Sequence, residues 1–141
     1  MKIAIGSDHR GFQYKDAVVS AFPDIEWVDV GCNGTERCDF PTFAHKVVDK
    51  ILQKEVQRGI VICGSGIGMS IAANRFKGIY AALVWNTELA KLCRQHNNSN
   101  VLALSANFIS VDQAIEIVKV WYETEFLGGH YQTRVAMLDK I

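Results

Sequence analysis

The sequence predicts an α/β protein: a three-layer α/β/α sandwich around a five-stranded, parallel, Rossmann-like sheet. The first observation is that apolar runs recur along the chain and are mostly continuous rather than alternating, which is typical of strands covered on both faces. The second is that helical patterns lie between these runs, so strands and helices alternate as in a parallel sheet. The third is the length of 141 residues, which suits one domain, and we expect residues 1–141 to form one.

The expected elements follow from these runs in order. The strands are expected at residues 2–6, 25–30, 59–63, 79–84 and 101–104, and the helices at 12–22, 43–55, 68–76, 87–96 and 111–126. Asn86, Thr87 and Ser110 stand where a helix N-terminus needs a capping side chain. Pro41 suits the first turn of a helix.

The C-terminal segment 127–141 stands apart from this alternation. It contains the helix-stopping pair Gly128 and Gly129 near its start, and it has too few apolar residues to form a core of its own. We expect this segment to pack across a surface, and the surface of a partner subunit is the natural candidate.

The composition limits the classes of partner. Hydrophobic residues make up 49% of the chain, and 15 basic residues balance 15 acidic ones, so no overall field attracts nucleic acid or an anionic membrane. The longest apolar run, IYAALVW, is far shorter than the roughly 18 to 20 residues of a membrane span, and the N-terminus lacks the pattern of a secretory signal. We expect a cytoplasmic protein that binds small molecules or copies of itself, without nucleic-acid or membrane partners.

The four cysteines show no pattern of a disulfide framework or a metal site. Cys32, Cys38, Cys63 and Cys93 have neither C-x-x-C pairing nor zinc-type spacing with the four histidines. We therefore expect free thiols in a reducing compartment and no metal site.

Polar residues follow the first and third expected strands. The first strand ends in Ser7, Asp8 and His9, and the third ends in Cys63 followed by the glycine-rich loop GSGIG. If these two strands are neighbours, both clusters line one crevice at the carboxyl edge of the sheet. The loop then presents backbone N–H groups at the start of a helix, which favours an anion or a developing oxyanion.

This loop lacks the residues of the common nucleotide-binding loops. A P-loop needs lysine and then serine or threonine after its last glycine, whereas Met69 and Ser70 follow Gly68. The dinucleotide motif needs a glycine where Met69 stands, and it belongs after a first strand rather than a third. The pattern therefore argues against a nucleotide cofactor.

Two candidate reactive residues each have a plain structural explanation as well. Cysteine at a strand end is often only a small buried apolar residue, but Cys63 stands where a helix N-terminus favours the thiolate, which is a base or a nucleophile. His96 stands near the end of an expected helix, where it can interact with the helix dipole, and the sequence does not place it in the crevice. His45 is expected at the surface. The tryptophans are expected in the core or in an interface: Trp27, Trp85 and Trp121.

Five segments together resemble one enzyme family. GSDHRGFQYK, DFPTFA, GIVICGSGIGMSIAANRFKGI, CRQHNNSNVLAL and FLGGHYQTRV are similar, in order and spacing, to the motifs of the ribose-5-phosphate isomerase B family, which also includes allose- and galactose-6-phosphate isomerases. The resemblance runs along nearly the whole chain. It implies an aldose–ketose isomerase for phosphorylated sugars without a metal or organic cofactor. The expected pair is ribose 5-phosphate and ribulose 5-phosphate, in the pentose phosphate pathway.

The resemblance also implies residue roles. Cys63 falls on the cysteine that moves a proton between C1 and C2 through an enediolate, His96 falls on the histidine that opens the sugar ring and donates a proton, and Ser65 is counted with them as catalytic. The implied substrate-binding residues are Asp8, His9, Gly64, Ser65, Gly66, Ile67, Gly68, Asn97, Asn107, His130 and Arg134. In the family the C-terminal segment reaches into a neighbouring subunit's site, which implies a homodimer or homotetramer with shared active sites.

The chain departs from the family pattern at several positions. The family usually has threonine at Ser65 and tyrosine at Phe40, and it commonly has arginine at Asn107, His130 and Tyr80. Of the phosphate-binding arginines, only Arg134 is retained. The phosphate pocket is therefore the part of the site where this chain differs most.

Three other functions are compatible with these residues. The first is isomerisation of another sugar phosphate, such as that of allose, galactose or erythrose, because the lost arginines fall where substrate length would be measured. The second is acyl transfer, with Cys63 as nucleophile and His96 as base. The third is a catalytically silent sugar-phosphate-binding subunit, against which the joint presence of Asp8, Cys63, His96 and Asn97 argues.

Overall fold

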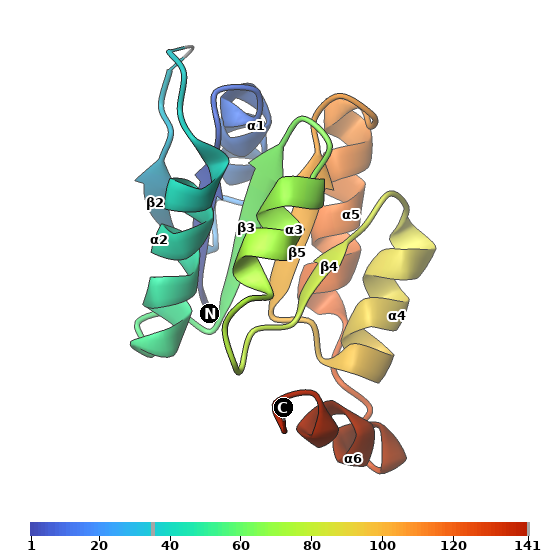
Figure 1. The fold of residues 1–141 in the computed structure, drawn as a ribbon. Coiled ribbons are helices and arrows are strands. Elements are labelled where there is room, and N and C mark those ends of the chain that lie inside the picture. Colours follow the sequence, from blue (N-terminus) through green and yellow to red (C-terminus); the bar gives the residue numbers. More distant parts are fainter. Residues whose placement is uncertain (35, 141) are drawn as a thin grey trace.

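The computed structural model describes residues 1–34 and 36–140 and confirms the α/β class, with five parallel strands in one sheet (Figure 1). The strands are β1 (Lys2–Ser7), β2 (Glu26–Gly31), β3 (Arg58–Cys63), β4 (Ala81–Leu83) and β5 (Val101–Ser105). The helices are α1 (Phe12–Ala21), α2 (Phe40–Leu52), α3 (Ile67–Ala73), α4 (Thr87–Asn97), α5 (Val111–Glu123) and α6 (His130–Met137).

Each expected strand and helix is present, with shifted ends. β4 is shorter than expected because the backbone N–H of Tyr80 bonds to the side chain of Asn100 (2.8 Å) instead of joining the strand ladder. Helix α2 begins earlier than expected, at Phe40, and Pro41 lies in its first turn, where a missing N–H costs nothing. Helix α6 lies within the C-terminal segment, for which no helix was expected.

The predicted helix caps are confirmed at two positions and wrong at one. The side chain of Asn86 accepts a hydrogen bond from the backbone N–H of Leu89 (2.8 Å). Ser110 forms a capping box with Gln113, in which each side chain bonds to the other residue's backbone N–H. Thr87 is the first residue of α4 rather than its cap.

The strand order is β2-β1-β3-β5-β4, so the winding of the chain reverses between β1 and β3. Ser7 pairs with Ile62, and Cys63 pairs with Ser105. The carboxyl ends of β1, β3 and β5 therefore meet at one edge of the sheet, and open α/β sheets bind ligands at such an edge.

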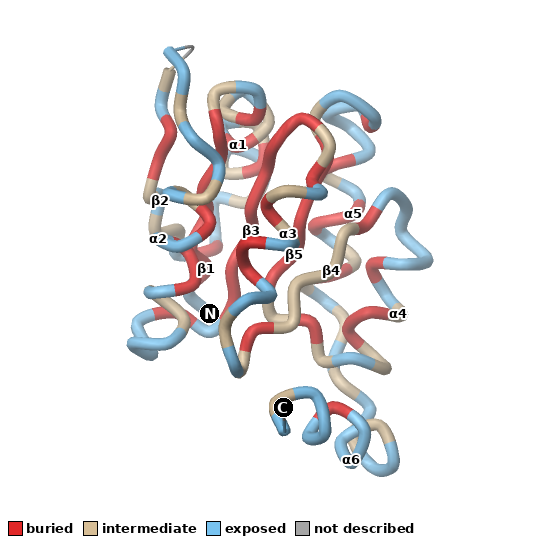
Figure 2. The backbone as a smooth tube through the Cα atoms, viewed as in Figure 1, coloured by how far each residue is buried: buried red, intermediate tan, exposed pale blue. Residues whose placement is uncertain are grey.

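Helices cover both faces of the sheet, which confirms the three layers. Helices α1, α4 and α5 pack on one face in a core that includes the fully buried Trp121. Helices α2 and α3 pack on the other face around Val47, Val61 and Met69. Figure 2 shows the result as a sheet that is mostly buried, with exposed residues on the outer surfaces of the helices.

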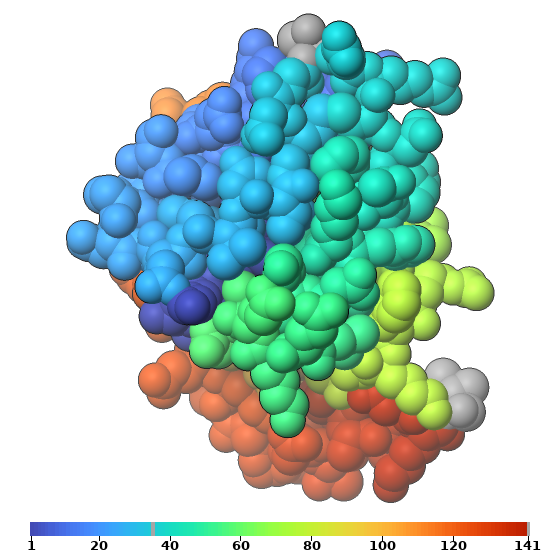
Figure 3. All heavy atoms as spheres, turned by 90° about the vertical axis from the view of Figure 1, so that its left-hand side faces the viewer, coloured from blue at the N-terminus to red at the C-terminus, as the bar shows by residue number. Residues whose placement is uncertain are grey.

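The C-terminal segment belongs to neither layer. After Gly128 and Gly129, both with positive φ, helix α6 packs against α4 of the same chain. It lies at the end of the molecule where the strands begin, as seen in Figure 1, and Figure 3 shows the C-terminal residues far from the loop that follows β2.

The expectation of four free thiols is wrong for two of them. Cys32 and Cys38 form a disulfide, with their Cα atoms 6.4 Å apart, which is within the range that a disulfide spans. Cys63 and Cys93 are free and buried. The inference of a reducing compartment depended on free thiols and loses that support.

The aromatic residues follow the expectation in part. His45 is exposed, as expected. Trp121 lies in the core and Trp27 is half-buried, whereas Trp85 is 57% exposed and so does not belong to the core of the chain. Within the described residues, no helix has the length and apolarity to cross a bilayer, and no group of histidine, cysteine and acidic side chains could hold a metal ion.

Candidate active site

Cys63 is the last residue of β3, and the glycine loop folds over its sulfur. The backbone N–H of Gly66 donates to Cys63 Sγ at 3.1 Å. Gly66 has φ +77°, and a Cβ there would collide with Leu83, so the turn requires glycine on both counts. The thiol is thus 6% exposed and bonded to the loop that would face a ligand.

The rest of the loop is held by short-range bonds and by neighbouring elements. Ser65 Oγ accepts a hydrogen bond from the backbone N–H of Ile67 (3.1 Å). The ring of Phe40 lies against Gly68, where it would obstruct any Cβ. The carbonyl of Gly64 accepts from the backbone N–H of Asn107 (2.9 Å), which ties the loop to the residues after β5.

Asp8 and His9 lie at the end of the neighbouring strand β1. The backbone N–H of Asp8 donates to the carbonyl of Ile62 (3.1 Å), which fixes this turn beside Cys63. Asp8 Oδ1 accepts from the backbone N–H groups of Arg10 and Gly11. His9 Nδ1 accepts from the backbone N–H of Cys38 (3.4 Å), so in the neutral ring the proton is on Nε2, which is left to donate.

These residues form what we call the cysteine half-site: Asp8, His9, Cys63, residues 64–68 and Asn107. The prediction that β1 and β3 are neighbours is confirmed, so the polar residues that follow these two strands lie at the same edge of the sheet. A thiol that is close to N–H donors, a carboxylate and an imidazole can move a proton and stabilise the oxyanion that results.

The other predicted residues lie at the opposite end of the sheet. His96 and Asn97 end helix α4, and the carbonyl of the nearby Asn100 accepts from the N–H of Gly59, near the start of β3. From Gly59 to Cys63 the strand rises about 13 Å. The structure therefore does not bring Cys63 and His96 together within one chain.

Helix α6 adds the last two predicted residues to this end. The ring of His96 stacks on Tyr131 with centroids 4.4 Å apart and an angle of 8° between the planes. His130 and Arg134 are exposed on the same helix. We call His96, Asn97, His130 and Arg134 the histidine half-site.

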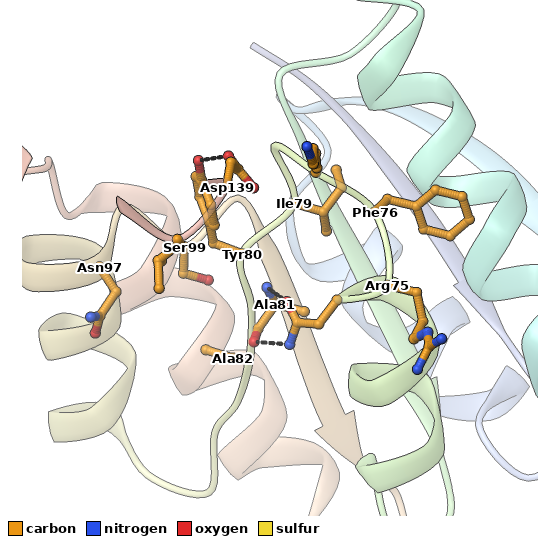
Figure 4. A pocket seen from close by; sticks show the side chains of 12 residues that line it. Arg75, Phe76, Ile79, Tyr80, Ala81, Ala82, Asn97, Ser99 and Asp139 are labelled. Atoms are coloured by element: carbon orange, nitrogen blue, oxygen red, sulfur yellow. Dashed lines mark hydrogen bonds between the residues drawn. The ribbon is translucent and has the colours of Figure 1, made fainter. Parts of the chain in front are cut away.

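A cavity of about 800 Å³ borders this half-site (Figure 4). It lies between the end of α3, strand β4 and the C-terminal segment, and Asn97 is part of its wall. Tyr80 donates to Asp139 Oδ2 (2.6 Å), and Asp139 Oδ1 accepts from the N–H of Gly78 (3.0 Å). The hydrogen bond between the side chains of Tyr80 and Asp139 raises the pKa of Tyr80 to about 12 and lowers the pKa of Asp139.

Sequence reasoning missed several residues at both half-sites. Tyr131 follows the predicted His130 directly, but its stacking on His96 depends on the path of the C-terminal segment. Arg10 stands inside the quoted GSDHRG segment, and its side chain lies over Gly64. Ser105 ends β5 beside Cys63, and its hydroxyl is the one buried side-chain polar atom of the described residues without a hydrogen-bond partner.

Comparisons with known proteins agree with this architecture. The model of the ribose/galactose isomerase family matches residues 3–138. Ribose-5-phosphate isomerase B of Escherichia coli is 40% identical over 142 residues, which cover 99% of this chain and 95% of the relative.

Solved structures are similar over the same length. A ribose 5-phosphate isomerase of Thermotoga maritima has a TM-score of 0.97 and 43% identity, covering 99% of this chain and 98% of that one. Ribose-5-phosphate isomerase B of Mycoplasma genitalium with bound ribulose-5-phosphate has a TM-score of 0.94 and 38% identity, covering 99% and 94%. The chain belongs to the ribose/galactose isomerase family.

Proposed function

We propose that this protein is an aldose–ketose isomerase that interconverts ribose 5-phosphate and ribulose 5-phosphate in the pentose phosphate pathway. The observation that carries the proposal is the cysteine half-site, where the sulfur of Cys63 lies under a loop of N–H donors beside Asp8 and His9. Relatives that are named ribose-5-phosphate isomerase B match nearly the whole chain, and one of them holds ribulose-5-phosphate.

In the proposed reaction Cys63, as thiolate, removes the proton from C2 of the open-chain aldose and returns a proton to C1. The electrons of the broken C–H bond form an enediolate, whose negative oxygen is stabilised by N–H groups of the glycine loop and by the hydroxyl of Ser65. The proton of the C2 hydroxyl passes to the oxygen on C1 as C2 becomes the ketone carbonyl. Asp8 and His9 hold the sugar hydroxyls, with His9 Nε2 as the donor.

We further propose that two copies of the chain complete each site. The cysteine half-site and the histidine half-site lie at opposite ends of one sheet, so ring opening by His96 and phosphate binding by Arg134 require a second copy. The C-terminal segment 127–141 carries the exposed side chains of His130 and Arg134, which suits contact with a partner subunit.

The decisive experiment compares Cys63→Ala with Cys93→Ala on a panel of four-, five- and six-carbon aldose phosphates. Loss of the base lowers kcat on ribose 5-phosphate by about 10²- to 10⁴-fold while substrate binding persists. Cys93, buried on α4, is the matched control and keeps the wild-type kcat. Near-normal turnover in Cys63→Ala contradicts the assignment.

A second candidate is isomerisation of another sugar phosphate. Asn107 at the cysteine half-site and His130 at the histidine half-site stand where the family commonly has arginine, so the phosphate contacts differ from the family pattern. A higher kcat/KM on allose, galactose or erythrose phosphate than on ribose 5-phosphate would select this candidate. The cytoplasmic location inferred from the sequence stays a prediction.

A further inference from the structure

Arg10 lies at the mouth of the cysteine half-site. Its backbone N–H donates to Asp8 Oδ1 (2.9 Å), so the root of the side chain is fixed in the turn after β1. The side chain then crosses Gly64: a Cβ added to Gly64 would be 3.1 Å from Arg10 Cδ and 2.8 Å from Asn107 Nδ2. Arg10 and Asn107 therefore converge on the first residue after Cys63.

The charge of Arg10 is not neutralised by the described part of the chain. The five ion pairs found among residues 1–34 and 36–140 do not include Arg10, and its side chain is exposed. Asn107, its neighbour over Gly64, is neutral. This end of the sheet thus presents an arginine without an ion-pair partner among the described residues, and its Cδ and the amide of Asn107 both lie over the residue that follows Cys63.

The proposed substrate has a phosphate group, and a guanidinium is the side chain that best matches phosphate oxygens, because it donates two parallel hydrogen bonds as well as charge. Arg134 belongs to the histidine half-site, at the other end of the sheet. Arg10, by contrast, lies in the same chain and at the same end of the sheet as Cys63.

We propose that Arg10 binds the phosphate group of the substrate, with Asn107 as a neutral second donor. This inference rests on the proposed function. It also explains how position 107 can lack a charge: the side chains of residues 10 and 107 both lie over Gly64, so a cation at either position would act on the same group.

The test compares Arg10→Met with Arg37→Met, which removes another exposed arginine from the loop before α2. Methionine keeps most of the aliphatic length and removes the charge. Arg10→Met raises KM for ribose 5-phosphate by about tenfold or more, since a hydrogen bond to a charged group is worth more than a neutral one, and kcat changes little. Arg37→Met leaves both constants at the wild-type values. An unchanged KM in Arg10→Met, or a fall in kcat alone, overturns the proposal.

Moving the charge provides the second test. In the double variant Arg10→Met/Asn107→Arg, KM returns toward the wild-type value, because the cation again lies over Gly64. If KM stays as high as in Arg10→Met, with the fold intact by circular dichroism, the proposal that residues 10 and 107 act on the same phosphate group is overturned. Arg10→Lys keeps the charge without the planar fork and gives an intermediate KM.

Binding of inorganic phosphate separates this inference from the proposed function. Isothermal titration of phosphate into wild type, Arg10→Met and Arg37→Met needs no turnover. Weaker binding in Arg10→Met alone supports the anion site even if ribose 5-phosphate is not converted. Equal binding in all three proteins overturns it, even in an active isomerase.

Discussion

At the scale of single residues, Arg58 and Arg94 are charged side chains that stabilise the fold rather than bind a ligand. Both arginines are buried, and both donate to main-chain carbonyls near the end of α5: Arg58 Nη1 to Trp121 (3.0 Å) and Arg94 Nε to Thr124 (3.1 Å). Burial, and then the charge of Arg94, lowers the pKa of Arg58 to about 10. These two arginines satisfy the last carbonyls of a helix, whereas Arg10 and Arg134 remain exposed and available to a ligand.

Cys93 gives a prediction about pH. Burial raises the pKa of its thiol above the ordinary value of 9.0, which applies to the unfolded chain. As pH rises past 9.0, the unfolded state releases this proton first, so the folded state binds more protons and the free energy of unfolding falls by up to about 1.4 kcal/mol per pH unit. Cys93→Ala removes this contribution to the pH dependence of the free energy of unfolding. Urea unfolding between pH 7 and 10 should therefore show a steeper loss in wild type than in the variant, and parallel curves would contradict the prediction.

His96 gives a prediction about the substrate form. If His96 opens the ring, His96→Asn is slow on ribose 5-phosphate, which must be opened, but comparatively active on erythrose 4-phosphate, which is too short to close a stable phosphate-bearing ring. The measurement is the ratio of kcat on the two substrates in wild type and variant. Equal losses on both substrates would show that His96 takes part in the proton transfer itself.

At the scale of elements, the C-terminal segment 127–141 is attached to α4 and to the residues before β4 by a few contacts. Tyr80 and Gly78 both donate to Asp139, and Tyr131 stacks on His96, while only Val135 of α6 is buried. An element with so little buried apolar surface opens more readily than the core. The position of His130 and Arg134 therefore depends on these few contacts rather than on an extensive apolar core.

Tyr80→Phe tests the attachment. Loss of the hydroxyl leaves Asp139 with one of its two recorded donors, so amide hydrogen exchange becomes faster in 130–137 and stays unchanged in β3 and β5. The lowered pKa of Asp139 and the raised pKa of Tyr80, about 12, keep the bond intact at neutral pH, so the difference between variant and wild type is constant from pH 6 to about 8. Tyr14→Phe, which removes a hydroxyl bonded to Ile109 elsewhere in the chain, is the control. Identical exchange in α6 of both variants would contradict the role of Tyr80.

At the scale of the whole molecule, the separation of the two half-sites gives a prediction about assembly. Mixing Cys63→Ala with Arg134→Ala, each inactive alone, produces hybrid dimers in which one of the two sites is intact. With free exchange of subunits, about half of the dimers are hybrids, and each hybrid has one intact site out of two. Activity therefore returns to about a quarter of the wild-type value.

The control for this mixture is a demonstration that subunits exchange, for example by mass spectrometry of isotopically labelled chains. Exchange without recovered activity would mean that each site is built within one chain. The C-terminal segment would then have to move from its place beside α4.

Much of this molecule could be predicted from its sequence because the information is local. A continuous apolar run followed by glycines predicts β3, the loop and α3, and the position of Cys63 follows from them. Most of the remainder depends on contacts between distant parts of the chain. The stacking of His96 on Tyr131 and the passage of Arg10 over Gly64 are set by how elements meet. The Cys32–Cys38 disulfide is local, but the spacing of the two cysteines matches no familiar disulfide or metal pattern, so the sequence does not predict it.

The disulfide has a practical consequence for labelling. With Cys32 and Cys38 joined, Cys63 and Cys93 are the free thiols of the described residues, and both are buried. Burial raises the pKa of Cys93, which leaves less of its reactive thiolate, whereas the proposed reaction uses Cys63 as a thiolate, so we expect an alkylating probe to modify Cys63 first. One fluorophore or spin label per chain, attached without removing any native cysteine, would then mark the active site itself. In the proposed dimer, the separation of two such labels measures the distance between the two sites and reports directly on how the subunits are arranged.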